Sequence, residues 1–277
     1  MCLILFSYQP DTEAPLILGA NRDEFFNRPT LPVDFWEDAP ELLAGRDLQA
    51  GGTWLGITRS GRFAVITNVR EPNAAVENPS SRGELTRNFL LGDSSPEEYL
   101  QQIAKKSQNY AGFNLIVGTF GGARSSLYYF SNRQPEITAL SSGTYGLSNH
   151  LLDTPWPKVN DGKAVLRQKL DSTKGNHNAI RNLLECPVTA GDDRLPSTGV
   201  GYKTEKALSA IFISSLKDYG TRATSVLTIN RHNIKFCEQN YGASADGKPN
   251  KEGKLRLFTF AYKQARNIDR PGLQTLV

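Results

Sequence analysis

Short apolar runs bounded by polar turns dominate the two ends of the chain. The runs at Cys2–Tyr8 and Leu16–Ala20 predict two antiparallel strands, because residues 9–13 between them have the composition of a hairpin loop. A second hairpin is predicted from residues 51–57 and 62–67, with its turn at Ser60-Gly61. Further strand patterns, the first four expected to form a meander, lie at residues 113–118, 127–131, 136–140, 144–148, 223–229, 234–241 and 255–262.

Helical signals gather in the middle of the chain. Ser81 with Glu84, and Ser95 with Glu98, have the spacing of capping boxes that open helices. Further helices are predicted over residues 158–170, 177–184 and 203–216. The segments between these elements are polar or rich in turn residues and are expected to be connections, at residues 27–47, 186–201 and 242–253.

This order of elements predicts an α+β fold. Strands at both ends with helices between them argue against an alternating βαβ plan. Two antiparallel sheets packed face to face, with helices on their outer sides, accommodate the order. A length of 277 residues with 39% apolar content is compatible with one large domain, and we expect a single domain over residues 1–277.

Composition excludes several classes of function. With 32 basic and 28 acidic side chains the net charge is +4, which is too balanced for a nucleic-acid-binding surface. The three cysteines fit neither a zinc spacing nor a disulfide framework, so a reducing cytoplasm is expected. No apolar stretch has the length of about 20 residues that spans a bilayer, and no signal peptide is evident. With three histidines and one methionine, neither a metal site nor a cofactor is expected.

Cys2 is the first candidate for chemistry. Removal of Met1 would place a thiol and a free α-amine on one residue. Since the amine titrates near pH ~8 and the thiol near ~8.5, the amine can take the thiol proton at neutral pH without a histidine. Alternatively, a small cysteine simply fits the first position of a core strand.

Polar residues end the second predicted strand beside the start of the first. In Asn21-Arg22-Asp23-Glu24, a carboxylate can hold the Cys2 amine and an arginine can lower the thiol pKa. The same four residues are also compatible with a solvated, salt-bridged turn.

Three further polar residues stand at strand ends. Asn68 and Asn149 each follow a predicted strand, where a side-chain amide can donate to the oxyanion of an acyl-transfer reaction, although asparagine is also an ordinary turn residue. Arg222 precedes the strand at 223–229 and can clamp a carboxylate or a thiolate, or lie on the surface. Gly51-Gly52 permits close approach of the backbone to a ligand, or marks a bulge.

Taken in order, these motifs resemble the NRDE-motif family, also called the transport and Golgi organisation protein 2 family. The resemblance covers nearly the whole chain. It is carried by Asn21-Arg22-Asp23-Glu24, Gly51-Gly52-Thr53-Trp54-Leu55-Gly56, Thr67-Asn68-Val69-Arg70, Ser81-Arg82-Gly83, Gly146-Leu147-Ser148-Asn149, Thr154-Pro155-Trp156-Pro157-Lys158 and Gly220-Thr221-Arg222.

The family is in turn similar to the cysteine branch of the N-terminal nucleophile hydrolases, which cleave amide bonds on an α-β-β-α sandwich. The resemblance implies that fold here, with Cys2 as nucleophile and Asp23 orienting its amine. It further implies oxyanion contacts from Asn149 and Asn68 and a site arginine at Arg222. Residues implied to contact a small acyl or amide substrate are Asn21, Arg22, Glu24, Trp54 and Arg82.

One position departs from the hydrolase pattern. Those enzymes carry an arginine three residues before the aspartate, where this chain has Ala20. Arg22 does not simply replace it, because neighbouring side chains of a strand point to opposite faces. A non-catalytic carrier of haem, acyl-CoA or another amphipathic ligand therefore stands as the alternative, in line with the family's association with haem trafficking and lipid homeostasis. A purely structural interaction module is the third hypothesis.

Overall fold

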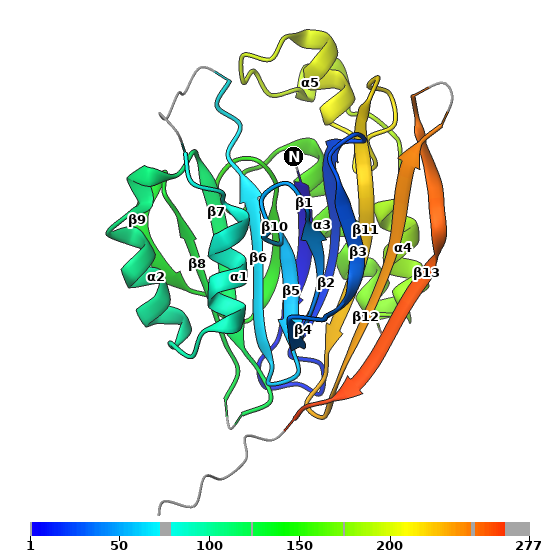
Figure 1. The fold of residues 1–277 in the computed structure, drawn as a ribbon. Helices are drawn as coiled ribbons and strands as arrows, with labels where there is room; N and C mark the ends of the chain where they lie inside the picture. The colour runs from blue at the N-terminus through cyan, green and yellow to red at the C-terminus, as the bar shows by residue number, and fades with distance from the viewer. Residues whose placement is uncertain (1, 73–78, 123, 174, 245–246, 264–277) are drawn as a thin grey trace, which may run out of the picture.

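A computed structural model describes residues 2–72, 79–122, 124–173, 175–244 and 247–263, which form two antiparallel β-sheets (Figure 1). The six-stranded sheet has the order β10 (Gly143–Leu147), β1 (Cys2–Tyr8), β2 (Leu16–Phe25), β11 (Tyr219–Ile229), β12 (Asn233–Ala243) and β13 (Pro249–Ala261). The seven-stranded sheet has the order β3 (Thr30–Trp36), β4 (Ala39–Asp47), β5 (Leu55–Thr58), β6 (Arg62–Asn68), β7 (Phe113–Thr119), β8 (Ser126–Ser131) and β9 (Gln134–Ala139).

Helices cover the outer face of each sheet, which makes a four-layer α-β-β-α sandwich. Helices α1 (Gly83–Leu91) and α2 (Pro96–Ala104) pack on the seven-stranded sheet. Helices α3 (Pro157–Thr173) and α4 (His177–Leu184) pack on the six-stranded sheet. Figure 1 shows the short helix α5 (Tyr202–Leu208) at one end of the sandwich, near the start of β1. The α+β sandwich expected from the sequence is confirmed.

The first strand is buried on both faces. Ile4 and Phe6 join the core between the two sheets, whereas Leu3 and Leu5 join the core under α3 and α4. This explains why β1 is a continuous apolar run instead of an alternating one. It also fixes the register of β1 with its neighbouring strands, because a shift of one residue would move the side chains of one core into the other.

Both predicted hairpins form. The first joins β1 to β2, with Cys2 opposite Arg22. The second joins β5 to β6 through Gly61, whose φ of 87° lies in the left-handed region that glycine adopts without strain. The helices predicted over residues 158–170 and 177–184 are confirmed as α3 and α4, and the capping box of Ser95 with Glu98 opens α2.

The structure corrects the expected course of the chain in the first half. Residues 27–47, expected to be a polar connection, contain the hairpin of β3 and β4, which buries Val33, Leu42 and Leu43. Pro32 is tolerated because β3 is an edge strand. The capping box expected at Ser81 is absent, since Arg82 is the N-cap of α1 and contributes no side-chain cap.

Three later expectations are also corrected. The meander ends at β9, because β10 pairs with β1 in the other sheet and thereby removes an exposed edge from that strand. The helix expected over 203–216 stops at Leu208, after which buried residues such as Ile213 run beside β11 and hydrogen-bond to it. Much of the expected loop tip at 242–253 is strand, since β13 begins at Pro249.

Across the residues that the structure describes, no helix combines the length and apolar character needed to cross a bilayer.

Candidate active site

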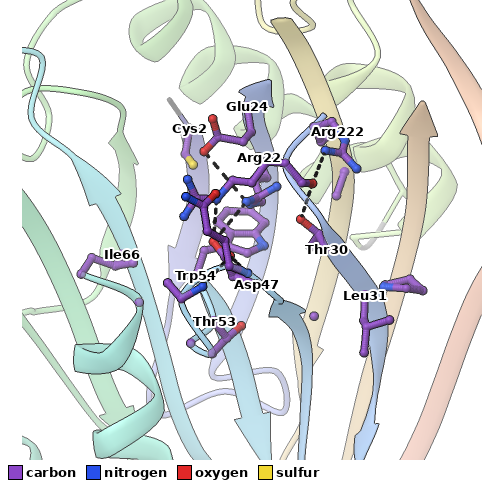
Figure 2. Close-up of a pocket in the computed structure, with 18 of the residues that line it drawn as sticks. Cys2, Arg22, Glu24, Thr30, Leu31, Asp47, Thr53, Trp54, Ile66 and Arg222 are labelled. Carbon is purple, nitrogen blue, oxygen red and sulfur yellow. Dashed lines mark hydrogen bonds and ion pairs between the residues drawn. The ribbon is translucent and has the colours of Figure 1, made fainter. Parts of the chain in front are cut away.

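A cavity of about 770 Å³ is lined by residues of both sheets, and Cys2 contributes to its wall. This volume is within the range of about 300–1,000 Å³ that is usual for small-molecule sites. Its wall comes from both sheets and from the start of α1. Figure 2 shows Arg22 and Glu24 close to Cys2, with Arg222 across the site and Ile66 and Leu31 at its edges. The basic lining residues are Arg22, Arg28, Arg82, Arg222, Lys254 and Arg256.

Cys2 is the first residue of β1 and is 9% exposed. Burial raises the pKa of its thiol, the Asp23 charge adds to this rise, and the Arg22 guanidinium lowers the pKa. The thiol is therefore accessible from the cavity but is not ionised by its surroundings alone. A base must remove its proton before it can act as a nucleophile.

Arg22 lies on the same face of the sheet as Cys2, because the two residues are paired across β1 and β2. Its guanidinium lies 3.9 Å from the Glu24 carboxylate and 3.8 Å from the Asp47 carboxylate. Asp47 also accepts a hydrogen bond of 2.7 Å from Arg28 Nε. Arg22 is thus held beside the thiol by acidic partners on two strands, as Figure 2 shows.

Asp23 is 1% exposed and is paired across strands with Thr221, whose Oγ1 donates a hydrogen bond of 2.8 Å to Asp23 Oδ1. Burial raises the pKa of this carboxyl, while the Lys158 ammonium acts to lower it. Asp23 also contributes to the cavity wall. Asp23 lies near Cys2, since its charge raises the pKa of the thiol, and its role in orienting the Cys2 amine stays a prediction.

Asn21 and Asn149 are not among the residues that line the cavity. Asn21 is fully buried on the helix side of the sheet, where its Nδ2 donates to the carbonyls of Leu184 and Ile211, each at 2.8 Å. Asn149 is also fully buried, and its Nδ2 donates to the Asn68 carbonyl at 3.0 Å. Asn68 itself does line the cavity.

Arg222 is the extra residue of a β-bulge between Thr221 and Ala223. The bulge turns its side chain toward the end of β2, where Nη1 donates to the carbonyls of Phe25 and Arg28, each at 2.9 Å. Burial lowers the pKa of its guanidinium. The side chain therefore both braces the loop that follows β2 and lines the cavity.

The remaining expected contacts, Trp54 and Arg82, also line the cavity. Trp54 packs against both the inter-sheet core and the core under α1. Arg82 donates a hydrogen bond of 3.1 Å from Nη1 to the Gly112 carbonyl. Burial lowers the pKa of Arg82, and the Cys2 thiolate acts in the opposite direction, which indicates that the two groups are close.

Gly51 and Gly52 each have a structural role. Gly51 has a φ of 69°, which favours glycine. A Cβ on Gly52 would lie 2.4 Å from the Gly83 carbonyl carbon, so only glycine lets α1 start this close to β5. The close approach expected at this pair is to the backbone of α1, which brings Arg82 to the cavity.

Sequence reasoning assigned no role to Lys158, although it stands in one of the matching motifs. The lysine is 3% exposed and lies near Asp23 and Cys2. Glu238 was also missed: this 3% exposed carboxylate lines the cavity and accepts hydrogen bonds from both sheets. Both residues come from elements far from Cys2 in the sequence. The signal that could have indicated them is a charged residue among the apolar positions of a buried element.

Comparison with known sequences decides the family, because residues 1–243 match the Transport and Golgi organisation 2 family. The chain belongs to this family. The human Transport and Golgi organization protein 2 homolog is 33% identical over 258 residues, covering 87% of this chain and 93% of the relative. The Drosophila melanogaster Transport and Golgi organization protein 2 is 31% identical over 282 residues, covering 91% and 96%.

Similar solved structures include two amide hydrolases, which are distant in sequence from this family member. A C2A mutant of conjugated bile acid hydrolase from Clostridium perfringens has a TM-score of 0.47 and 11% identity, covering 93% of this chain and 96% of that one. The Caenorhabditis elegans ortholog of N-acylethanolamine-hydrolyzing acid amidase has a TM-score of 0.45 and 13% identity, covering 66% and 85%. At these scores no residue role or activity is transferred.

Within the residues that the structure describes, no three His, Cys, Asp or Glu side chains are grouped as a metal site would require.

Proposed function

We propose that this protein, once Met1 is removed, is a cysteine hydrolase that cleaves an amide or related acyl bond of a small amphipathic substrate. The observation that carries the proposal is the position of Cys2. Cys2 is the first residue of β1 and lines a cavity of about 770 Å³. Arg22 lies on the same face of the sheet as Cys2, and Asp23 lies near the Cys2 thiol.

In the proposed reaction the free α-amine of Cys2 takes the thiol proton, so that the S–H bond breaks and an N–H bond forms. The sulfur then attacks the acyl carbon, and the protonated amine donates its proton to the leaving group. Water hydrolyses the resulting thioester and restores the thiol. Asp23 would accept a hydrogen bond from the amine and orient it.

The oxyanion contacts are proposed at Asn68 and Asn149. The position of Asn68 at the cavity wall supports a direct role for it. Asn149 hydrogen-bonds to the Asn68 carbonyl and would act by holding that backbone. Arg22, Glu24, Trp54, Arg82 and Arg222 are proposed substrate contacts because all five line the cavity, whereas the hydrogen bonds of Asn21 support a structural role.

The proposal is tested by labelling with a thiol-directed acyl electrophile. Three forms are compared: a chain released from a cleavable tag so that it begins at Cys2, the same chain with Cys2→Ser, and a form that keeps Met1. We expect labelling only of the chain that begins at Cys2, located by peptide mass spectrometry. Equal labelling with Met1 retained, or no labelling of the processed chain, contradicts the mechanism. Intact mass of natively expressed protein shows whether Met1 is removed.

A second candidate function is carriage of an amphipathic ligand with an anionic end. It is favoured by the six basic residues that line the cavity, which outnumber its five acidic ones, alongside the apolar Leu31, Ile66 and Trp54. For haem, Cys2 is the lining residue of a type that ligates iron. Stoichiometric binding of haem or an acyl-CoA that survives Cys2→Ala, without turnover, would support the carrier. Binding weaker than high micromolar for both ligands would exclude it.

The cytoplasm remains the proposed location, on the composition of the chain and its few cysteines.

A further inference from the structure

Lys158 occupies a costly position in the first turn of α3. Its side chain is buried, and its Nζ has no hydrogen-bond partner among the residues that the structure describes. The positive end of the helix dipole lies at this turn, so a cation is unfavourable there as well. Burying a cation without a hydrogen bond is destabilising unless another charge compensates it. The position therefore requires a partner charge close by.

The surroundings of Lys158 identify that partner. Helix α3 packs on β1 and β10, which brings Lys158 near Cys2 on β1 and Asp23 on β2. Burial lowers the pKa of Lys158 to about 8, the Asp23 carboxylate and the Cys2 thiolate act to raise it, and Arg70 acts to lower it. Asp23 is the stronger of the two anionic influences.

The other charged groups of this region already have partners. Arg70 follows β6, stacks on the Trp156 ring at 4.6 Å and forms a buried ion pair of 2.8 Å with Glu205. Arg22 lies within 4 Å of Glu24 and Asp47. Tyr219 on β11 donates a hydrogen bond of 3.0 Å to the Asp23 carbonyl. Among the charges that lower the pKa of Asp23, Lys158 has the largest influence, ahead of the N-terminal amine and Arg22, and it does not line the cavity.

We propose that Lys158 is a positioning residue of the Cys2 site, whose ammonium is the counter-ion that keeps the buried Asp23 carboxylate charged. A buried carboxylate without a cation takes up a proton, and a neutral Asp23 is a poor hydrogen-bond acceptor for an ammonium. A charged Asp23 would in turn hold the Cys2 amine and act on the Cys2 thiol, so Lys158 would act on the Cys2 site through Asp23. This second consequence rests on the proposed hydrolase function, whereas the pairing of Lys158 with Asp23 does not.

The pairing is tested by a double-mutant cycle in the chain that keeps Met1. Lys158→Met keeps the length of the side chain, Asp23→Asn keeps its shape, and the double variant removes both charges. Because one buried charge alone is worse than none, we expect the double variant to unfold at least tenfold less readily than additive effects predict. Lys163→Met, in the same helix but in a partly exposed pair with Asp153, is the control. Additive effects in urea titrations overturn the proposal.

The consequence for the thiol is tested by the pH dependence of Cys2 alkylation with iodoacetamide in the chain that begins at Cys2. This measurement also serves if Asp23→Asn fails to fold. Because a neutral Asp23 no longer raises the pKa of the thiol, we expect Lys158→Met to move the half-maximal rate about one pH unit downward and Lys158→Arg to stay near wild type. An unchanged profile in Lys158→Met overturns the role at Cys2. An unreactive Cys2 in wild type beside a coupled Lys158–Asp23 pair overturns the hydrolase proposal and leaves the pairing.

Discussion

Two neighbouring residues of β2 serve opposite sides of the six-stranded sheet. Arg22 shares the cavity face with Cys2, whereas the Asp23 side chain bonds to Thr221 under the helices. The thiol consequently lies between a cation of the cavity wall and a buried carboxylate, and the two influence its pKa in opposite directions. At the residue scale, strand alternation therefore decides the electrostatics of the candidate nucleophile.

His177 gives a prediction on pH and stability at the same scale. Its Nε2 lies 2.8 Å from Thr228 Oγ1, and burial together with the Lys235 charge lowers its pKa to about 4. As pH falls from about 6.5, the unfolded chain takes up a proton before the folded chain does, so stability present above pH 6.5 is lost toward pH 4. We expect a loss of about 1 kcal/mol between pH 7 and pH 5, allowing for the partial exposure of the ring.

The measurement is urea unfolding at pH 7 and pH 5 for wild type, His177→Gln and His232→Gln. His232 is exposed in the turn between β11 and β12 and provides the matched control. The pH-dependent loss should shrink in His177→Gln and persist in His232→Gln. An equal loss in all three proteins would assign the pH dependence to other groups.

The sequence could predict part of the site because that part is local. Cys2, Arg22 and Glu24 meet through one hairpin, whose loop composition is readable from the chain. The sequence could not predict into which side of the structure the Asn21 and Asn149 side chains point, because this depends on which strand or helix covers each side. Lys158 approaches Asp23 from a helix more than a hundred residues away, and only the packing of α3 on β1 reveals it.

At the scale of elements, the local sequence predicted a helix or strand correctly where the spacing of its apolar residues alone defines the buried face. It failed where the pairing with another strand determines the structure. Both hairpins and helices α3 and α4 follow from periodicity. The meander pattern predicted β10 beside β9, but β10 instead pairs with β1 in the other sheet, although it follows β9 closely in the sequence. Proline and charge concealed β3, because an edge strand tolerates both.

The two segments with the Ser-x-x-Glu spacing of a capping box give a prediction at this scale. Ser95 Oγ accepts the Glu98 backbone N–H at 3.3 Å, and Glu98 Oε2 accepts the Ser95 backbone N–H at 3.1 Å. Ser81 makes no such cap on α1. We expect Ser95→Ala to lower the free energy of unfolding by about 1 kcal/mol and Ser81→Ala to change it by less than about 0.5 kcal/mol. Urea titration compares them, and equal losses would contradict the assignment of the caps.

At the scale of the whole molecule, the apolar core packs the two sheets together, and residues of both sheets line the cavity. Glu238 on β12 links the two sheets: its Oε1 accepts the Val33 backbone N–H at 2.9 Å, and its Oε2 accepts from Ser225 Oγ at 2.8 Å. Arg256 adds an ion pair of 2.7 Å to Asp34 on the same edge. These polar links tie β3 to the six-stranded sheet, and we expect them to hold the two sheets at a fixed spacing beside the cavity.

Replacing Glu238 by glutamine tests how firmly the sheets are joined. The amide nitrogen cannot accept a hydrogen bond, so either Val33 or Ser225 loses its acceptor while the side-chain volume is kept. We expect a loss of about 1–3 kcal/mol in the free energy of unfolding, and faster hydrogen exchange at the Val33 amide. Glu136→Gln on the exposed face of β9 should change stability by less than about 0.5 kcal/mol. If Val33 exchange is unchanged in Glu238→Gln, the apolar core alone sets the spacing of the sheets, and the cavity does not depend on this carboxylate.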